Sequence, residues 1–219
     1  KSFVKRRGHI SRAQERAVEE GMPKWGIAYN AQMQIDFDAQ WGTTGQANWL
    51  EIGFGMGETT AKIAKAHPNV NYLGVEIYTA GVGSLIKLIE EENIENIRII
   101  SHDVVDVLRD MIPDASLDKV LLYFPDPWRK ARHHKRRLIQ PEFVAKLAKK
   151  MKPGGVLHCA TDWENYAHHM HDVLSVAPNW QNMASTPFAP RPNDRPLTKF
   201  ENRGIKLGHG VWDLLYRVR

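Results

Sequence analysis

Apolar residues recur along the chain in short runs, and amphipathic stretches with a helical period separate these runs. From residue 47 onward the apolar runs predict strands at 48–52, 71–75, 97–101, 117–124, 155–160 and 211–218. The amphipathic stretches predict helices over about 58–67, 79–92, 104–110, 141–151 and 164–174. Such an alternation is typical of a doubly wound α/β fold, in which a mostly parallel sheet carries helices on both faces.

The chain before this alternation is predicted to be a lead-in. Residues 1–40 are interpreted as a basic N-terminal extension and lead-in, and residues 41–219 as a single domain. The first 25 residues are polar and basic, which predicts a mobile arm that is either an RNA-contacting extension or a solvated tail. Residues 22–26 are expected to form a turn, and Phe37 and Trp41 to pack on the outside of the domain.

A long segment near the C-terminus carries no predicted strand or helix. Residues 187–203 are rich in proline and arginine. Loops of this length in a compact domain are usually functional or disordered. The segment is therefore interpreted as a flap that closes over a substrate, with a disordered connector as the alternative.

Composition restricts the environment of the protein. The formal net charge is +5 and the isoelectric point about 9.3, which mildly favours a polyanionic partner. Cys159 is the single cysteine, so an internal disulfide is excluded and a reducing compartment is favoured. The sequence has neither an apolar run long enough to span a membrane nor an N-terminal secretory signal, so we expect a cytoplasmic protein that does not bind membranes.

A glycine-rich turn follows the first predicted strand, in the sequence Glu-Ile-Gly-Phe-Gly-Met-Gly at 51–57. Gly53, Gly55 and Gly57 would let the backbone approach a ligand at the start of a helix. The dinucleotide fingerprint has the spacing G-x-G-x-x-G, whereas here the spacing is G-x-G-x-G. Glu51 would repel a pyrophosphate but would suit the ammonium group of S-adenosylmethionine.

Acidic residues also follow the second and third predicted strands. Glu76 ends the second strand and could accept hydrogen bonds from two ribose hydroxyls. Asp103 follows the third strand and could meet an adenine amino group. A glycine turn and two acids, each placed after an apolar strand, predict a site for S-adenosylmethionine.

The fourth predicted strand leads into Phe-Pro-Asp-Pro-Trp at 124–128, where two prolines stiffen the loop around Asp126. Ligands bind at the carboxyl ends of such strands, so this loop is interpreted as the reaction site, with a rigid turn as the alternative. The run 129–137 follows, with six cations and two histidines. We interpret it as a contact to RNA phosphates, and a membrane surface is less favoured because the run lacks an apolar face.

Two other clusters are not interpreted as functional sites. His168, His169 and His171 lie on a predicted helix without a carboxylate or thiol at ligand spacing, so we predict no metal site. The adjacent residues 101–103, Ser-His-Asp, are not a catalytic triad, because the members of a triad come from separated segments.

Six motifs together resemble those of one family. They are Glu-Ile-Gly-Phe-Gly-Met-Gly (51–57), Val-Glu (75–76), Phe-Pro-Asp-Pro-Trp (124–128), Ala-Thr-Asp-Trp (160–163), Thr-Lys-Phe-Glu (198–201) and Gly-His-Gly-Val-Trp-Asp (208–213). From residue 49 onward the chain resembles the bacterial tRNA (guanine-N7-)-methyltransferase family. The resemblance implies a Rossmann-like class I methyltransferase fold with a seven-stranded, mostly parallel sheet and an antiparallel C-terminal strand. It also implies S-adenosylmethionine as cofactor and tRNA as partner, with transfer of a methyl group to a guanine of the variable loop, position 46 of the tRNA.

The resemblance also implies roles for individual residues. Asp126 would be catalytic, and the residues lining the cofactor would be Glu51, Gly53, Gly55, Gly57, Glu76, Asp103 and Asp126. Substrate would be bound by Lys130, Asp162, Thr198, Lys199, Phe200 and Glu201. The residues contacting RNA would be Arg132, His133, His134, Lys135, Arg136 and Arg137. The oligomeric state is left open between a monomer and a homodimer.

The chemistry can be argued without the resemblance. Guanine N7 has a lone pair and no proton, so its methylation needs no general base, and the base becomes cationic. We expect the carboxylates of Asp126 and Asp162 to share two tasks, stabilising that charge and accepting hydrogen bonds from the N1 and N2 edge of the guanine. Trp128 or Trp163 could stack on the base.

Three alternatives remain at this point. The first is a methyltransferase for exocyclic amines, because 124–128 is distantly similar to Asp-Pro-Pro-Tyr loops. The second is a nicotinamide-dependent dehydrogenase, which the glycine spacing and Glu51 disfavour. The third is a protein that only binds RNA, which would leave the acidic residues unexplained.

Overall fold

The computed structural model describes residue 3 and residues 8–219. The strands in this part of the chain are β1 Ala47–Ile52, β2 Val70–Val75, β3 Ile97–Ile100, β4 Leu117–Tyr123, β5 Met151–Thr161, β6 Trp180–Asn182 and β7 Trp212–Val218. The helices are α1 Arg12–Trp25, α2 Phe37–Trp41, α3 Glu58–Ala66, α4 Thr79–Glu92, α5 Val104–Asp110, α6 Pro141–Lys150, α7 Glu164–Val176 and α8 Lys199–Lys206, together with the 3-10 helix η1 Ala131–Arg136.

The described strands form one sheet in the order β3-β2-β1-β4-β5-β7-β6. Strands β1 to β5 are parallel, and β7 runs antiparallel between β5 and β6. The predicted seven-stranded, mostly parallel sheet with an antiparallel C-terminal strand is therefore confirmed. The chain runs outward from β1 to β3 and returns beside β1 as β4, and ligands bind at such a change of direction in doubly wound sheets.

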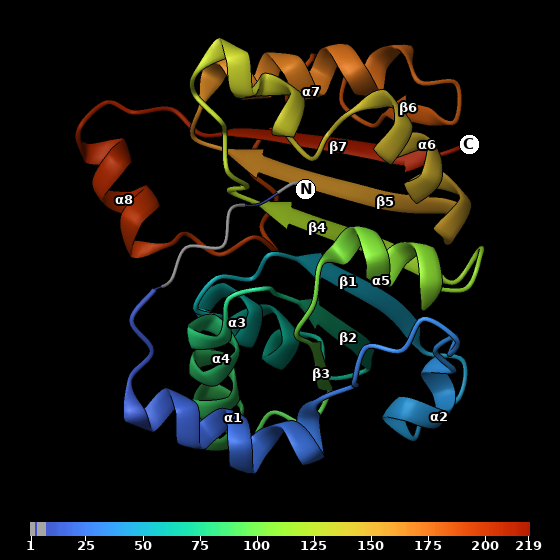
Figure 1. Ribbon diagram of the computed structural model, residues 1–219. Coiled ribbons are helices and arrows are strands. Elements are labelled where there is room, and N and C mark those ends of the chain that lie inside the picture. The colour runs from blue at the N-terminus through green and yellow to red at the C-terminus, as the bar shows by residue number, and fades with distance from the viewer. Residues whose placement is uncertain (1–2, 4–7) are drawn as a thin grey trace.

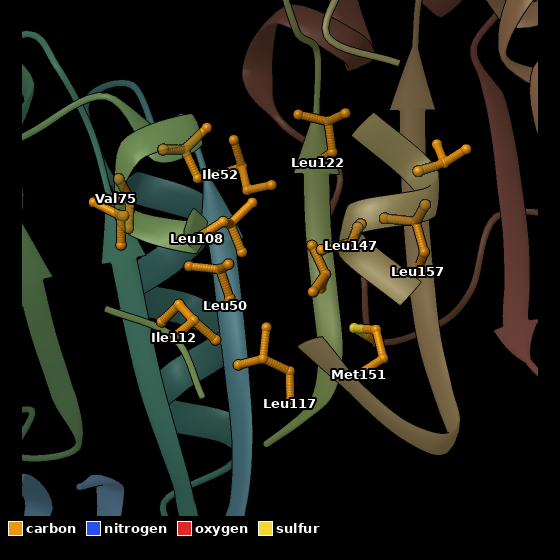
Figure 2. Packing of buried hydrophobic residues seen from close by; sticks show 14 of the residues in the cluster. Leu50, Ile52, Val75, Leu108, Ile112, Leu117, Leu122, Leu147, Met151 and Leu157 are labelled. Carbon is orange, nitrogen blue, oxygen red and sulfur yellow. The ribbon is translucent and has the colours of Figure 1, made fainter. Parts of the chain in front are cut away.

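Helices cover both faces of the sheet (Figure 1), and an apolar core lies on each face. Helices α5, α6 and α7 contribute to one core, and α3 and α4 contribute to the other. Figure 2 shows the first core, where Leu108 of α5 lies over Leu50 of β1 and Leu147 of α6 lies near Leu157 of β5. This packing fixes the strands whose ends carry the site.

The N-terminal segment differs from the prediction of a mobile arm. Residues 12–25 form α1, which begins with a capping box between Ser11 and Gln14. The predicted turn at 22–26 is the end of this helix. Helix α1 packs on α4 at Gly83, where an added Cβ would lie 2.5 Å from the carbonyl oxygen of Gln14. The predicted roles of Lys1, Lys5, Arg6 and Arg7 in the arm fall outside the described residues.

The lead-in after α1 also packs more deeply than expected. Phe37 and Trp41 of α2 were expected on the outside of the domain, and this was wrong, because both are buried in the first core. Their rings stack 5.4 Å apart, and the indole N–H of Trp41 donates a hydrogen bond to the carbonyl of Asn96. Residues 27–41 thus form part of the structure that supports the sheet.

The C-terminal half contains three elements that were not predicted, and the first of them is η1 within the basic run. β6 is a short edge strand, and α8 begins inside the segment interpreted as a flap. β5 begins at Met151, before the predicted start at residue 155, and its pairing with β4 is irregular. The part of the flap that precedes α8 lies against the sheet, because Lys119 of β4 donates a 2.7 Å hydrogen bond to Asp194.

Candidate active site

A cavity of about 290 Å³ opens at the carboxyl ends of β1, β2 and β4. Its volume is close to the lower end of the range for small-molecule pockets. Among the residues that line it are Gly53, Gly55, Glu76, Asp103 and Asp126. The structure therefore brings together the glycine turn and three of the acids that were singled out in the sequence.

The glycine turn leaves room for a ligand. Gly53 and Gly55 have left-handed φ angles of 67° and 59°, which other residues rarely adopt. No atom lies within 4 Å of a Cβ added at either position. Their exposed backbone therefore forms a cradle that a ligand can approach closely. Gly57 has a different role, because a Cβ there would lie 2.8 Å from Leu85 of α4.

Glu76 connects the end of β2 to the glycine turn. One carboxylate oxygen accepts a 2.8 Å hydrogen bond from the amide of Gly55, and the other accepts hydrogen bonds from the amides of Ile77 and Tyr78. These bonds fix the carboxylate at the cavity wall. The oxygen that accepts from Gly55 still has a lone pair for a ribose hydroxyl, whereas the other oxygen already accepts two hydrogen bonds.

Glu51 lies behind the cavity. Its side chain is only 2% exposed, and the hydroxyl of Tyr72 donates a 2.5 Å hydrogen bond to its carboxylate. Burial raises the pKa of Glu51 to about 7. The structure thus places Glu51 within the support of the glycine turn, and not on the wall where the sequence suggested a contact to an ammonium group.

Asp103 caps the helix that follows β3. One of its oxygens accepts a 3.0 Å hydrogen bond from the amide of Val105, the second residue of α5. The carboxylate is partly exposed at the cavity wall beside His102, whose ring stacks 3.7 Å from that of Tyr29. Asp103 is thus fixed in orientation and keeps an oxygen for a ligand donor.

The loop that holds Asp126 is unusually constrained. Phe124 and Trp128 both have left-handed φ angles, 51° and 45°, in addition to the prolines between them. Such angles are costly for residues with a side chain and often occur at functional sites. The Asp126 carboxylate is exposed, and one oxygen accepts a 3.0 Å hydrogen bond from the amide of Trp128. The other oxygen is available to a substrate.

The basic run divides into surface and interior. Lys130, Arg132, Lys135 and Arg136 are exposed on and beside η1, and His133 and His134 are partly exposed. Arg137 is buried, and the structure gives it an internal role, because it donates hydrogen bonds to the Pro127 carbonyl at 2.9 Å and to Asn165 at 2.7 Å. Arg137 therefore holds the Asp126 loop to α7.

The two tryptophans beside the site already have cationic partners. The guanidinium of Arg136 lies 5.1 Å from the ring centroid of Trp128, and that of Arg129 lies 4.6 Å from that of Trp163. Asp162, which immediately precedes Trp163 and follows β5, is exposed. An exposed cation–π pair contributes about 0.5–1 kcal/mol, less than the roughly 1–3 kcal/mol of a stacked base, so a base can replace the arginine.

The segment 198–201 also divides into internal and exposed side chains. Thr198 caps α8 by accepting a hydrogen bond from the amide of Glu201, and Glu201 itself is buried. Lys199 and Phe200 are exposed, Phe200 by 70%. Of these four residues, Lys199 and Phe200 are therefore the ones positioned to meet a substrate.

Sequence reasoning missed a buried polar network next to this segment. Arg195 is 1% exposed and donates hydrogen bonds of 2.7–2.9 Å to both Glu201 and Asp213. Asp213 also pairs with His158, whose other ring nitrogen contacts the hydroxyl of Tyr123. No sequence signal identified the network, because its members lie on β4, β5, β7, α8 and a loop.

The described residues contain no group of three or more His, Cys, Asp and Glu side chains arranged to hold a metal ion. Over the same part of the chain, no helix has the length and apolar character needed to cross a membrane.

Comparison with solved structures identifies the fold. The 16S rRNA methyltransferase KamB is similar with a TM-score of 0.61 at 14% identity, covering 85% of this chain and 95% of that one. The 16S rRNA (adenine(1408)-N(1))-methyltransferase of Catenulisporales acidiphilia has a TM-score of 0.55 at 18% identity, covering 84% and 92%. The sheet order and these similarities thus show the fold of class I methyltransferases.

Sequence comparison identifies the family within this class. The model of a family described as "Putative methyltransferase" matches residues 46–214. The tRNA (guanine-N(7)-)-methyltransferase of Ralstonia pickettii (strain 12J) is 56% identical over all of this chain and 84% of its own length, and that of Dechloromonas aromatica (strain RCB) is 58% identical over all of this chain and 88% of its own. The chain belongs to the tRNA (guanine-N(7)-)-methyltransferase family.

Proposed function

We propose that the protein transfers the methyl group of S-adenosylmethionine to N7 of a guanine in tRNA, at position 46 of the variable loop. The observation that carries this proposal is the position of Asp126, a fixed and exposed carboxylate on the wall of the cavity that the glycine cradle lines. The names of the relatives support the reaction and the substrate. The domain boundary at residue 41 stays a prediction.

The cavity residues fit S-adenosylmethionine. The open backbone at Gly53 and Gly55 would hold the methionyl part, Glu76 would accept a hydrogen bond from a ribose hydroxyl, and Asp103 would accept one from the adenine amino group. The bound cofactor supplies an electrophilic sulfonium methyl group. A dinucleotide is a poorer fit, because the glycine turn lacks the G-x-G-x-x-G spacing and Asp126 places negative charge on the cavity wall.

Asp126 would act on the guanine by electrostatics and orientation. The N7 lone pair forms the new bond to the methyl carbon, the electron pair of the carbon–sulfur bond stays on sulfur, and the positive charge passes to the purine. N7 loses no proton, so the carboxylate is not needed as a base. It stabilises the charge that develops on the ring and accepts hydrogen bonds from the base edge, as a preorganised group does in other enzymes.

The exposed cations on and beside η1 would bind the tRNA backbone. Lys130 and residues 132–136 lie directly after the Asp126 loop, so phosphates held there would place the neighbouring nucleotide at the cavity. The guanine base would replace the guanidinium of Arg136 on the ring of Trp128. Asp162, Lys199 and Phe200 would contact the same nucleotide from the ends of β5 and α8.

The test is to incubate the protein with unmodified tRNA transcript and S-adenosylmethionine, digest the RNA and identify methylated nucleosides by mass spectrometry. The expected product is 7-methylguanosine, which should disappear when the position 46 guanine is replaced by adenine. N6-methyladenosine would instead support the exocyclic-amine alternative. No product despite binding of S-adenosylhomocysteine would show that tRNA is not the substrate.

The same proposal sets the remaining expectations. A tRNA-modifying enzyme of this family would act in the cytoplasm, where its substrate is. We also expect a monomer or a homodimer. Light scattering of the purified protein distinguishes these two states.

A further inference from the structure

Helix α8 is attached to the rest of the molecule in an unusual way. Glu201 is its only buried residue, with an exposed fraction of 3%. Phe200, Ile205 and Leu207, on α8 and directly after it, are 52–70% exposed. Figure 1 shows α8 standing apart from the sheet, on the side toward which β4 and β5 point. An apolar face therefore does not fix this helix, and a buried carboxylate does.

Arg195 is the partner of that carboxylate and connects it to the sheet. Its Nη1 and Nη2 donate to the two oxygens of Glu201 at 2.7 and 2.9 Å, and its Nε and Nη2 donate to the two oxygens of Asp213 at 2.7 and 2.8 Å. Asp213 lies on β7, the strand that pairs with β5. One planar guanidinium thus joins α8 to the sheet through two bidentate contacts.

Arg195 also lies next to the loop that carries Asp126. Its guanidinium is 5.7 Å from the ring centroid of Phe124, the residue with a left-handed φ at the start of that loop. The amide of Phe124 donates a hydrogen bond to the Ala160 carbonyl on β5. This bond fixes the backbone of the residue whose ring Arg195 faces. Arg195 is therefore in contact with both halves of the proposed substrate site.

We infer that Arg195 is a positioning residue for methyl transfer, which fixes Lys199 and Phe200 of α8 relative to the Asp126 loop through Glu201. This inference rests on the proposed function, because it assigns these two segments to one substrate. Arg195 touches neither cavity nor solvent, so its effect is transmitted by the orientation of its partners.

The shape of the Arg195 side chain can be tested separately from its charge. Lysine at position 195 would keep the positive charge and lose the planar fork, so it could not make both bidentate contacts. Glu201→Gln would keep the shape of the partner and remove its charge. If Arg195 acts through Glu201, the double variant R195K/E201Q should lose no more than the more damaging single variant, whereas independent residues would give multiplied losses.

The experiment measures kcat/KM for tRNA and the affinity for S-adenosylhomocysteine in the full-length wild type, R195K, E201Q and the double variant. We expect R195K to lower kcat/KM about 100-fold, as a misplaced positioning group does, with S-adenosylhomocysteine affinity unchanged within about twofold. Arg98→Lys is the matched control, because Arg98 is a half-buried arginine on β3 that faces Trp25 and Trp41 outside the active cavity. It should change kcat/KM less than about threefold.

Hydrogen exchange separates positioning from a loss of folding. In R195K the amides of α8 should exchange at least about tenfold faster, while those of β1 and β4 stay protected. Suppose that the wild type makes 7-methylguanosine. A near-normal kcat/KM in R195K, or a loss in the double variant equal to the product of the single losses, would then overturn the inference. A wild type that makes none would overturn the proposed function and the role of Arg195 in it, and the exchange data would still report whether Arg195 holds α8.

Discussion

Replacing Glu51 with glutamine should remove a pH-dependent loss of stability. Glu51 is buried under the glycine turn, accepts a hydrogen bond from Tyr72 and has a pKa raised from 4.5 to about 7 by burial. In the folded protein it therefore holds its proton up to higher pH than in the unfolded chain. Glutamine has a similar shape, can accept the same hydrogen bond, and does not titrate.

The direction and the size of the change in the free energy of unfolding follow from this difference in pKa. Below pH 4.5 both states bind the proton, and the neutral carboxyl is fully compatible with burial. Between pH 4.5 and about 7 the unfolded state releases the proton first, so the free energy of unfolding falls as the pH rises. A pKa difference of this size corresponds to a total loss of about 3 kcal/mol, of which roughly 2 to 3 kcal/mol falls between pH 5 and pH 8.

The assay is urea unfolding of wild type and Glu51→Gln without cofactor, at pH 5, 6, 7 and 8, followed by tryptophan fluorescence. We compare the free energy of unfolding of the variant with that of the wild type at each pH. The contributions of other titrating groups, such as His158, are the same in both proteins and cancel in this difference. We expect this difference to move in favour of the variant by roughly 2 to 3 kcal/mol from pH 5 to pH 8. A difference that stays constant within about 0.5 kcal/mol would refute the reasoning, because Glu51 would then titrate alike in both states.

Three further variants test the site. Asp126→Asn should lower kcat for tRNA about 10- to 100-fold, because a charged interaction of about 1.5–3 kcal/mol is lost; turnover close to wild type in single-turnover assays would rule out the electrostatic role. Arg132→Ala combined with Lys135→Ala should weaken tRNA binding and reduce its salt slope by roughly 0.7–0.9 per lost phosphate contact; filter binding from 50 to 200 mM salt measures this, and an unchanged slope would remove these residues from the interface. Gly55→Ala should weaken S-adenosylhomocysteine binding, because the methyl group of alanine would enter the cradle. Strain at a φ of 59° should also destabilise the fold by about 1–2 kcal/mol. Calorimetry that shows wild-type affinity for S-adenosylhomocysteine would place the cofactor elsewhere.

Much of the fold could be predicted because local signals agreed with the final packing. Helix α4 runs from residue 79 to 92 and α5 from 104 to 110, as predicted, since each has an apolar face that the sheet covers. The strands that end shortly before Gly53, Glu76 and Asp126 could be predicted for the same reason. Their order in the sheet places these residues around one cavity.

Helix α1 was missed because only a few apolar residues, Trp25 together with Ala17, Val18 and Met22, pack against the second core, and polar and charged residues surround them in the sequence. Its buried residues are Gly21 and Trp25, and it approaches α4 closely where Gly21 and Gly83 leave room. Hydropathy does not detect an interface formed by small residues. The capping box of Ser11 and Gln14 was the available local signal, because a serine followed three residues later by glutamine marks a helix start.

The roles of the charged residues could not be predicted, because a sequence does not show which charges are buried. Arg136 and Arg137 are neighbours in one basic run, yet Arg136 is exposed over Trp128 and Arg137 is buried against the Pro127 carbonyl. Burial of an arginine requires partners for its donors, and these partners are supplied by residues that are distant in sequence. The same requirement explains Glu201, which belongs to a motif with exposed Lys199 but has both oxygens bound to Arg195. A motif of this family therefore combines groups that meet the substrate with groups that hold them in place, and only the three-dimensional contacts separate the two.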